Sequence, residues 1–461
     1  MVAGLPFALL PVPSVCSAHR LQSLSYCIQP GSFRPRLRSS AALDPFRANA
    51  AAHISQAQFV VGLLTMSTLS SASNMPFRDS ALALMEDVYA PWKGAGSTGS
   101  KWIPKPLPQG EAGVVMLHGA PQSRYLWVDA WGLLSFVSLA RDCGADSEDR
   151  RDILAAARSL IATVHAVLGA PCTRTVPMSE RRGSTLGGAD STLSGYKGLR
   201  IGKVQCKLDT DFGMSCDGMY WHYVDKWVYA LARYAREAED VSILRDAVQV
   251  LLDVHPSFFE GSGMHWKLNV DLRPIRGHEY DVAPSSDAAT AWVVFDVLRQ
   301  TAEAMGDRES ARAIEPLLAE VASVGTAYFD AIGGQVTRDP LGYGLTAWKL
   351  QWVGERGQAQ REGVRRSLQA ALRVDSQTMA LPFRLYGALL GGRAVESDAR
   401  YGKRACTEAR ELLARVMPDM VAVEGRSKCD GRTEHSGINK VMLASVLAPV
   451  AFLRLPTETL L

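Results

Sequence analysis

From residue 78 onward, the sequence repeats one pattern, in which two segments with apolar residues at helical spacing are joined by a short polar connection. Connections such as 236–240 and 306–309 are typical of the tight turns in antiparallel helical hairpins. Repeated hairpins predict an all-α architecture, either an open solenoid or a closed toroid. Helices are expected at 78–90, 124–142, 148–168, 217–237, 241–259, 286–305, 308–329, 360–373, 377–391, 401–417 and 436–453.

A second regularity favours the toroid. Loops rich in ionisable and aromatic residues precede or begin every other helix, and the helices that follow them are more apolar than their hairpin partners. An inner ring of helices inside an outer ring has this pattern, with all inner N-termini opening onto one face. Six such loops predict an (α/α)6 toroid whose funnel collects polar and aromatic groups. The loops are 125–129, 217–222, 277–281, 342–344, 381–384 and 434–439.

The first 75 residues differ in composition from the rest of the chain. They are rich in Ser and Ala, and Asp44 is their one acidic residue. This is typical of a transit peptide, so we expect import into a plastid or mitochondrion. Because residues 2–12 are apolar, a secretory signal peptide is an alternative. A disordered N-terminus on a cytoplasmic protein is a further alternative. Residues 76–461 are expected to form a single toroid domain. The arginines of the segment are Arg20, Arg34, Arg36, Arg38 and Arg47.

The composition excludes several classes of protein. A chain of 461 residues with 47% hydrophobic and 21% charged residues is typical of a globular protein. The net charge of +3 and the lack of Lys/Arg blocks argue against nucleic-acid binding. Within the N-terminal segment, the longest apolar run, 59–66, is too short to span a bilayer. The eight cysteines include no Cys-x-x-Cys pair, and the His, Asp and Glu spacings match no ligand set, so no metal is expected.

Two motifs are better explained as chance matches to known sequence patterns. Residues 94–99 match Gly-x-Gly-x-x-Gly, but they follow a predicted helix without any βαβ pattern, so we expect a loop and no cofactor. Residues 114–119 resemble the strand and His-Gly of an α/β-hydrolase, yet the chain has no Gly-x-Ser-x-Gly turn.

The stretch 217–227 combines carboxylates, a histidine, a lysine and aromatic rings at the start of an amphipathic helix. A helix N-terminus presents polar groups and a favourable dipole to an anionic or polyhydroxyl ligand, so this stretch is the best candidate for one wall of a binding site. Asp129 is a second candidate, because a carboxylate begins an otherwise apolar helix there. A structural, hydrogen-bonded Asp129 is the alternative. Trp127 and Trp131 suit either a core or a platform for a sugar ring.

The run 265–281 is the densest group of ionisable side chains with adjoining aromatics. It falls between predicted helices, where binding residues are common and solvated charges are the alternative. Its candidates are Trp266, Lys267, Asp271, Arg273, His278 and Asp281.

Short motifs along the chain together resemble a largely uncharacterised group of the six-hairpin glycosidase-like superfamily. They are 125–129, 198–203, 217–223 with 226–227, 265–271, 381–384 and 441–444. Members of that superfamily are (α/α)6 toroids that act mainly on carbohydrates, so the resemblance implies the same fold here. The segments 277–284 and 434–437 depart from the pattern of the group, which puts the roles of Asp281 and His435 in doubt.

We therefore expect a glycoside hydrolase that acts on an oligosaccharide with a pair of carboxyl groups, one protonated and one ionised. The candidates are Asp129, Asp217 and Asp271, with the first two favoured. The number of basic residues favours an acidic sugar. A sugar 2-epimerase with paired histidines and a carbohydrate-binding protein without activity are the alternatives. The expected substrate-binding residues are Trp127, Arg200, Lys203, Tyr220, Trp221, His222, Lys226, Trp266, Lys267, Arg273, His278, Asp281 and His435.

Overall fold

A computed structural model describes residues 77–97, 102–104, 124–171, 178–202, 217–261, 263–275, 281–282, 286–331, 337, 339–371, 381–426 and 435–461. The chain divides into two units, Met1–Ala72 and Ser73–Leu461, and every described residue lies in the second unit. The segment expected to direct import therefore lies outside the described residues.

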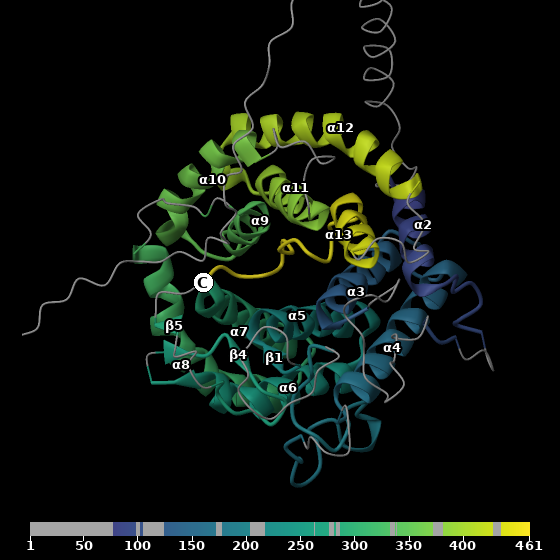
Figure 1. Ribbon diagram of the computed structural model, residues 1–461, viewed down its shortest axis with the longest axis vertical. Coiled ribbons are helices and arrows are strands. Elements are labelled where there is room, and N and C mark those ends of the chain that lie inside the picture. The colour runs from purple at the N-terminus through teal and green to yellow at the C-terminus, as the bar shows by residue number, and fades with distance from the viewer. Residues whose placement is uncertain are drawn as a thin grey trace, which may run out of the picture. The chain divides into compact units, whose positions relative to one another are not determined.

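The described helices of the second unit form two concentric rings (Figure 1). Each inner helix packs against the next, and the last packs against the first. Each outer helix covers an inner one. The predicted (α/α)6 toroid is thus confirmed. The inner ring is α3 (Leu126–Arg141), α5 (Trp221–Ala238), α7 (Ser286–Ala304), α9 (Pro340–Lys349), α11 (Pro382–Ser397) and α13 (Ser436–Leu447). The outer ring is α2 (Arg78–Tyr89), α4 (Glu148–Leu168), α6 (Val241–Phe258), α8 (Arg308–Ala331), α10 (Gln358–Ala371) and α12 (Lys403–Arg426).

The sequence explains which helices lie inside. In α3 every residue from Leu126 to Ala140 is buried, as expected for a helix that is apolar on all sides. The outer helix α4 buries one face only, and it begins at a Ser147 whose side chain accepts a hydrogen bond from the Arg150 amide at 3.2 Å. Among the described helices none is long and apolar enough to cross a membrane.

Short strands stand beside α5 and α6. Strand β1 (Met219–Tyr220) pairs antiparallel with β4 (Lys267–Leu268), which places Tyr220 opposite Lys267. Strands β2 (Phe259–Glu260), β3 (Gly263–Met264) and β5 (Asp281–Val282) form an antiparallel sheet in that order. Gly218 allows the first pairing, because a Cβ there would lie 2.2 Å from the Leu268 carbonyl oxygen. Two distant parts of the sequence thereby meet at the start of α5.

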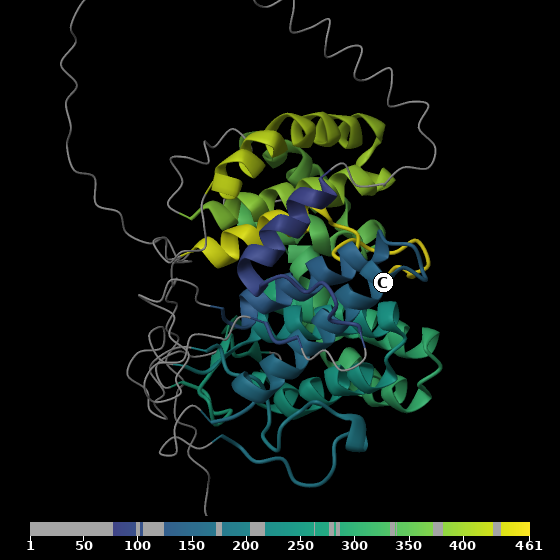
Figure 2. The same cartoon turned by 90° about the vertical axis from the view of Figure 1, so that its right-hand side faces the viewer.

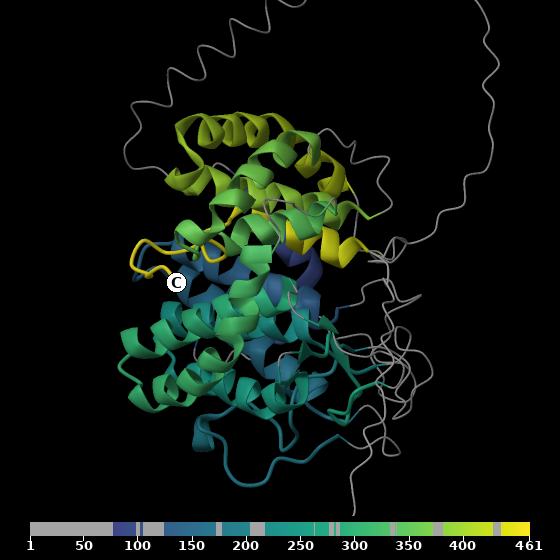
Figure 3. The same cartoon turned by 90° about the vertical axis from the view of Figure 1, so that its left-hand side faces the viewer.

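Residues 448–461, which we call the floor segment, turn back into the inner ring. The Phe452 ring lies 5.2 Å from that of Trp131 and 5.7 Å from that of Trp348, and the Phe452 carbonyl accepts hydrogen bonds from Tyr229 and Trp348, both at 2.8 Å. Glu458 forms a buried ion pair with Arg233. Trp348 and Arg233 lie toward the ends of their helices, and Tyr229 and Trp131 lie nearer the middle, so the floor segment fills the ring from the end at which the inner helices finish. Figures 2 and 3 show it in yellow at one side of the molecule.

Several expectations about helices were wrong. Helix α11 ends at Ser397 and not near 391, and α12 ends at Arg426 and not near 417. No helix was expected over 340–349, where α9 lies, because Pro and Gly residues occupy its first half. The last helix ends at Leu447 and not near 453, because the floor segment leaves it to enter the ring.

Candidate functional site

The structure gives the Asp129 carboxylate a complete set of protein partners. Arg124 binds both of its oxygens, with Nε 2.8 Å from Oδ1 and Nη2 2.9 Å from Oδ2, and the Tyr89 hydroxyl donates to Oδ1 at 3.1 Å. The side chains of Arg124 and Asp129 are 2% and 0% exposed. This is the arrangement of a structural, hydrogen-bonded aspartate.

Asp217 is engaged in the same way. Its Oδ2 lies 2.6 Å from Arg200 Nη1, and its Oδ1 accepts from the amides of Gly202 and Gly218, both at 2.9 Å. Arg200 also donates to two backbone carbonyls at the end of α4, those of Val167 and Ala170. The pair ties the loop before α5 to α4. Lys203 lies outside the described residues.

Asp271 lies in a third polar network. Its Oδ1 accepts from Ser179 at 2.9 Å, and its Oδ2 lies 3.1 Å from Nε of Arg273, whose side chain is 77% exposed. The three predicted carboxylates thus each have separate partners among the described residues, and their role in catalysis stays a prediction.

Several predicted binding residues do meet at the start of α5. The Tyr220 ring stacks on Trp266 at 5.4 Å and on His222 at 5.2 Å, and Trp127 lies 5.8 Å from His222. Tyr223, which the sequence analysis missed, lies 5.2 Å from Trp127. We call these five residues the aromatic wall. Lys267 lies with its Nζ 5.2 Å from the centre of the Tyr220 ring.

Other candidates lie elsewhere. Trp221 is fully buried between α5, α6 and α7, where it packs against Phe258 and Phe295. His435 lies just before α13, and its ring is 6.0 Å from Phe383 at the start of α11. His278 lies outside the described residues, and Asp281 is described only as part of strand β5.

Below the aromatic wall, α5, α7 and α9 contribute a group of ionisable side chains that we call the charged cluster: His222, Asp225, Lys226, Asp287 and Lys349. Lys226 Nζ lies 2.9 Å from Asp225 Oδ1, whereas the buried Asp225 Oδ2 has no hydrogen-bond partner among the described residues. His222 Nδ1 lies 3.8 Å from Asp287 Oδ2. Lys349 is fully buried and donates to the Ser286 carbonyl at 3.0 Å and hydroxyl at 2.6 Å.

The environment shifts the protonation of this cluster. Burial raises the pKa of Asp225, and the charge of Asp287 adds to that rise while Lys226 opposes it. Burial also raises the pKa of Asp287, against the effect of Lys226 and Lys349. Burial lowers the pKa of His222 to about 4, so its imidazole is neutral near pH 7. The His222 and Asp287 side chains remain 35% and 26% exposed, so water reaches both.

Two residues of this cluster were predicted, His222 and Lys226, and three were missed. The missed residues carry a signal in the sequence, since Asp225, Asp287 and Lys349 are charges within otherwise apolar inner helices. Such charges are rarely buried unless they are paired or functional. The described residues contain no group of three or more His, Cys, Asp or Glu side chains that would hold a metal ion.

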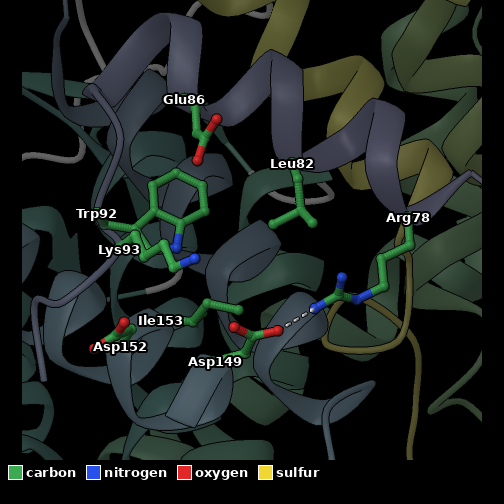
Figure 4. Close-up of a pocket in the computed structure, with 8 residues that line it drawn as sticks. All are labelled: Arg78, Leu82, Glu86, Trp92, Lys93, Asp149, Asp152 and Ile153. Carbon is green, nitrogen blue, oxygen red and sulfur yellow. Dashed lines mark ion pairs between the residues drawn. The ribbon is translucent and has the colours of Figure 1, made fainter.

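A separate cavity of about 150 Å³ lies between the outer helices α2 and α4 (Figure 4). Its charged groups are largely engaged with the protein, because Arg78 pairs with Asp149 at 4.0 Å and Asp152 accepts from the amides of Gly94 and Gly96. The charged cluster, on the inner ring, is therefore the better candidate for an active site.

No protein-family model matches the sequence, and no curated protein matches it significantly. Solved structures align over most of the chain. The fold is an (α/α)6 toroid. A family 76 glycoside hydrolase from a bovine Bacteroides thetaiotaomicron strain aligns with 12% identity over 82% of this chain and 78% of its own, at a TM-score of 0.44. A cellobiose 2-epimerase from Spirochaeta thermophila DSM 6192 aligns with 14% identity over 81% and 97%, at a TM-score of 0.43. Similarities this low leave the reaction open, and the fold assignment rests on the two rings of helices.

Proposed function

We propose that this chain is a carbohydrate-active enzyme that hydrolyses a glycosidic bond, with Asp225 and Asp287 as its two carboxyl groups. The observation that carries the proposal is the position of these carboxyl groups, whose pKa values are raised, on adjacent inner helices beside a wall of aromatic rings. Glycoside hydrolysis needs one carboxyl group that is protonated and one that is ionised.

The surroundings distinguish the two roles. Asp287 is open to water, and its raised pKa favours the protonated form, so it suits the general acid that protonates the leaving oxygen. Asp225 has an ammonium group 2.9 Å from Oδ1, which opposes the rise in its pKa, so we assign the ionised role to it. Its Oδ2 is buried and has no hydrogen-bond partner in the described structure, so it suits the acceptor for a proton of a water molecule that enters the site with the substrate.

The aromatic wall supplies the binding surface. Aromatic rings stack on the apolar faces of sugars, and their polar edges accept or donate hydrogen bonds. Tyr220 lies in β1, and Trp266 directly precedes β4, with its carbonyl accepting a hydrogen bond from the Trp221 amide at 3.0 Å, so backbone hydrogen bonds as well as side-chain contact hold the two rings together. We expect these rings to hold a sugar unit next to the charged cluster.

The test replaces each carboxyl group. Asp225→Asn and Asp287→Asn are assayed for release of reducing sugar from a panel of oligosaccharides, in water enriched in ¹⁸O. Loss of one acid or base group should lower kcat by about 10²–10⁴-fold. Glu303→Gln, on the same helix as Asp287 but 52% exposed, is the matched control and should keep native turnover. The proposal is wrong if both Asn variants remain folded, by circular dichroism, and hydrolyse at the native rate.

Sugar 2-epimerisation is the second candidate, and the neutral His222 favours it. An imidazole with a pKa of about 4 has its free nitrogen available to accept a proton from C2 of a sugar at neutral pH. The discriminating measurement is incubation of free sugars in D₂O. Deuterium at C2, without incorporation of ¹⁸O into new reducing ends in the parallel experiment, would favour epimerisation. Binding of oligosaccharide without either product would indicate a carbohydrate-binding protein.

A further inference from the structure

Within the charged cluster, a lysine is in direct contact with a serine that the proposed glycoside hydrolysis does not use. The Lys349 Nζ lies 2.6 Å from the Ser286 Oγ and 3.0 Å from the carbonyl oxygen of the same residue. Lys349 is the last residue of α9, and Ser286 is the first residue of α7, a neighbouring helix of the inner ring. The Ser286 carbonyl also accepts a hydrogen bond from Thr290 Oγ1 at 2.9 Å. Two packed helices therefore hold the amine and the hydroxyl together.

The two groups differ in their access to water. Ser286 is exposed, whereas Lys349 is 0% exposed. The Tyr328 ring of α8 covers the amine, with its centre 4.7 Å from Nζ. Both hydrogen bonds of the amine in the described structure go to uncharged oxygens of Ser286. A lysine is rarely buried unless it is paired or functional, so this contact calls for a chemical reading.

The surroundings lower the pKa of Lys349. Burial is the largest cause, and the charge of Lys226 on α5 adds to it. Tyr328 on α8, Asp287 on α7 and Asp225 on α5 act in the opposite direction. Because the net pKa lies below that of an ordinary lysine, a larger fraction of the amine is unprotonated near neutral pH than for a lysine in water. An unprotonated amine 2.6 Å from a hydroxyl is placed to accept its proton.

We propose that Ser286 and Lys349 form a serine–lysine dyad that hydrolyses a carboxylic ester, a second activity beside glycoside hydrolysis. Ser286 Oγ bonds to the acyl carbon, and Lys349 takes the hydroxyl proton. The bond from the acyl carbon to the alcohol oxygen then breaks, and Lys349 returns the proton to that oxygen. Water attacks the acyl-serine in the same way and gives a proton to Lys349. The Ser286 oxygen leaves with this proton as the carboxylic acid is released.

The alcohol part of the ester is a sugar, a choice that rests on the proposed function. The residue that follows Ser286 is Asp287, which lies 3.8 Å from His222 of the aromatic wall. A sugar bound at the wall therefore brings its hydroxyl groups close to the serine. An O-acyl group on one of these hydroxyl groups, such as an acetyl group, is the substrate class that the dyad fits.

The experiment measures release of acetate by the full-length protein from two probes, 4-nitrophenyl acetate and a methyl glycoside acetylated on its hydroxyl groups. The rate without protein is subtracted. Ser286→Ala should lower kcat by at least about 10²-fold and Lys349→Met by about 10²–10⁴-fold. Ser323→Ala, which changes an exposed serine on α8, is the matched control and should keep the native rate. Circular dichroism checks that each variant is folded, and Ser286→Ala removes an exposed hydroxyl without disturbing the core.

The pH dependence separates the two activities. Ester hydrolysis should rise with pH as Lys349 loses its proton and level off below the ordinary pKa of a lysine, whereas glycoside hydrolysis should fall as the pKa of the general acid Asp287 is passed. A native rate with Ser286→Ala, or no acetate above the protein-free rate from either probe, overturns the dyad and leaves glycoside hydrolysis standing. Hydrolysis of 4-nitrophenyl acetate alone, dependent on both residues, supports the dyad and overturns the sugar as the alcohol part. Release from both probes by a protein that forms no new reducing ends supports the dyad and overturns glycoside hydrolysis.

Discussion

Replacement of Asp129 by Asn is expected to lower the free energy of unfolding by about 3–5 kcal/mol. Asn keeps one acceptor oxygen for Arg124 but turns an amide NH₂ toward the other guanidinium nitrogen, so one of the two bonds at 2.8 and 2.9 Å is lost. A hydrogen bond to a charged group contributes about 1.5–3 kcal/mol. The rest of the loss comes from a guanidinium that is 2% exposed and no longer faces the charge of Asp129.

The assay is equilibrium unfolding in urea, followed by circular dichroism. Asp271→Asn is the matched control, because its partner Arg273 is mostly exposed and such pairs contribute about 0–1 kcal/mol. The double variant Arg124→Met with Asp129→Leu should recover part of the loss, since both charges leave together. An Asp129→Asn protein that unfolds at the same urea concentration as the native protein would refute the reasoning.

Three further predictions follow from buried contacts. His165 should lower the free energy of unfolding by about 2 kcal/mol between pH 6.5 and pH 5, because burial lowers its pKa to about 3 and the unfolded chain binds the proton more tightly over this range. His165→Gln should therefore reduce the pH dependence measured in urea titrations at the two pH values by about that amount. Gly344→Ala should destabilise the protein by about 1–3 kcal/mol in a thermal melt, because the new Cβ would lie 1.9 Å from the Gly387 carbonyl oxygen. Gly392→Ala is the control and should melt like the native protein, because its Cβ would lie 3.5 Å from the nearest atom. Trp266→Ala should raise KM for an identified oligosaccharide more than it lowers kcat, and an unchanged KM would argue against stacking of a sugar on this ring.

The alternation of inner and outer helices could be predicted because a helix that is buried on all sides contains few polar residues. An inner helix such as α3 has almost no polar positions, and its outer partner α4 has a charged face. Helix α9 could not be predicted in this way. Its Gly344 is a poor helix former, yet the lack of a side chain there lets α9 pack backbone to backbone against α11. The stabilisation comes from packing against α11, a contact between distant residues that the local sequence does not reveal.

The candidate site was predicted in part, for a related reason. The residues of the aromatic wall come from segments that the sequence identified as candidates, because each segment contains many aromatic and ionisable side chains. The carboxyl groups were harder, since Asp129 and Asp225 are both acids in the first turns of an inner helix. The structure distinguishes them, because the Arg124 guanidinium binds both oxygens of Asp129, while Oδ2 of Asp225 has no hydrogen-bond partner in the part of the chain that the structure describes.

The floor segment also constrains how the chain reaches its native state. Ser138 on α3 accepts a hydrogen bond from the Ala451 amide, 313 positions later in the sequence. The ring closes only when α13 packs against α3. Contacts between such distant residues slow folding, because the intervening chain must be ordered before they form. During synthesis the side of α3 that packs against α13 therefore stays uncovered until the last hairpin is made, and we expect nascent chains truncated before residue 436 to aggregate or to bind chaperones.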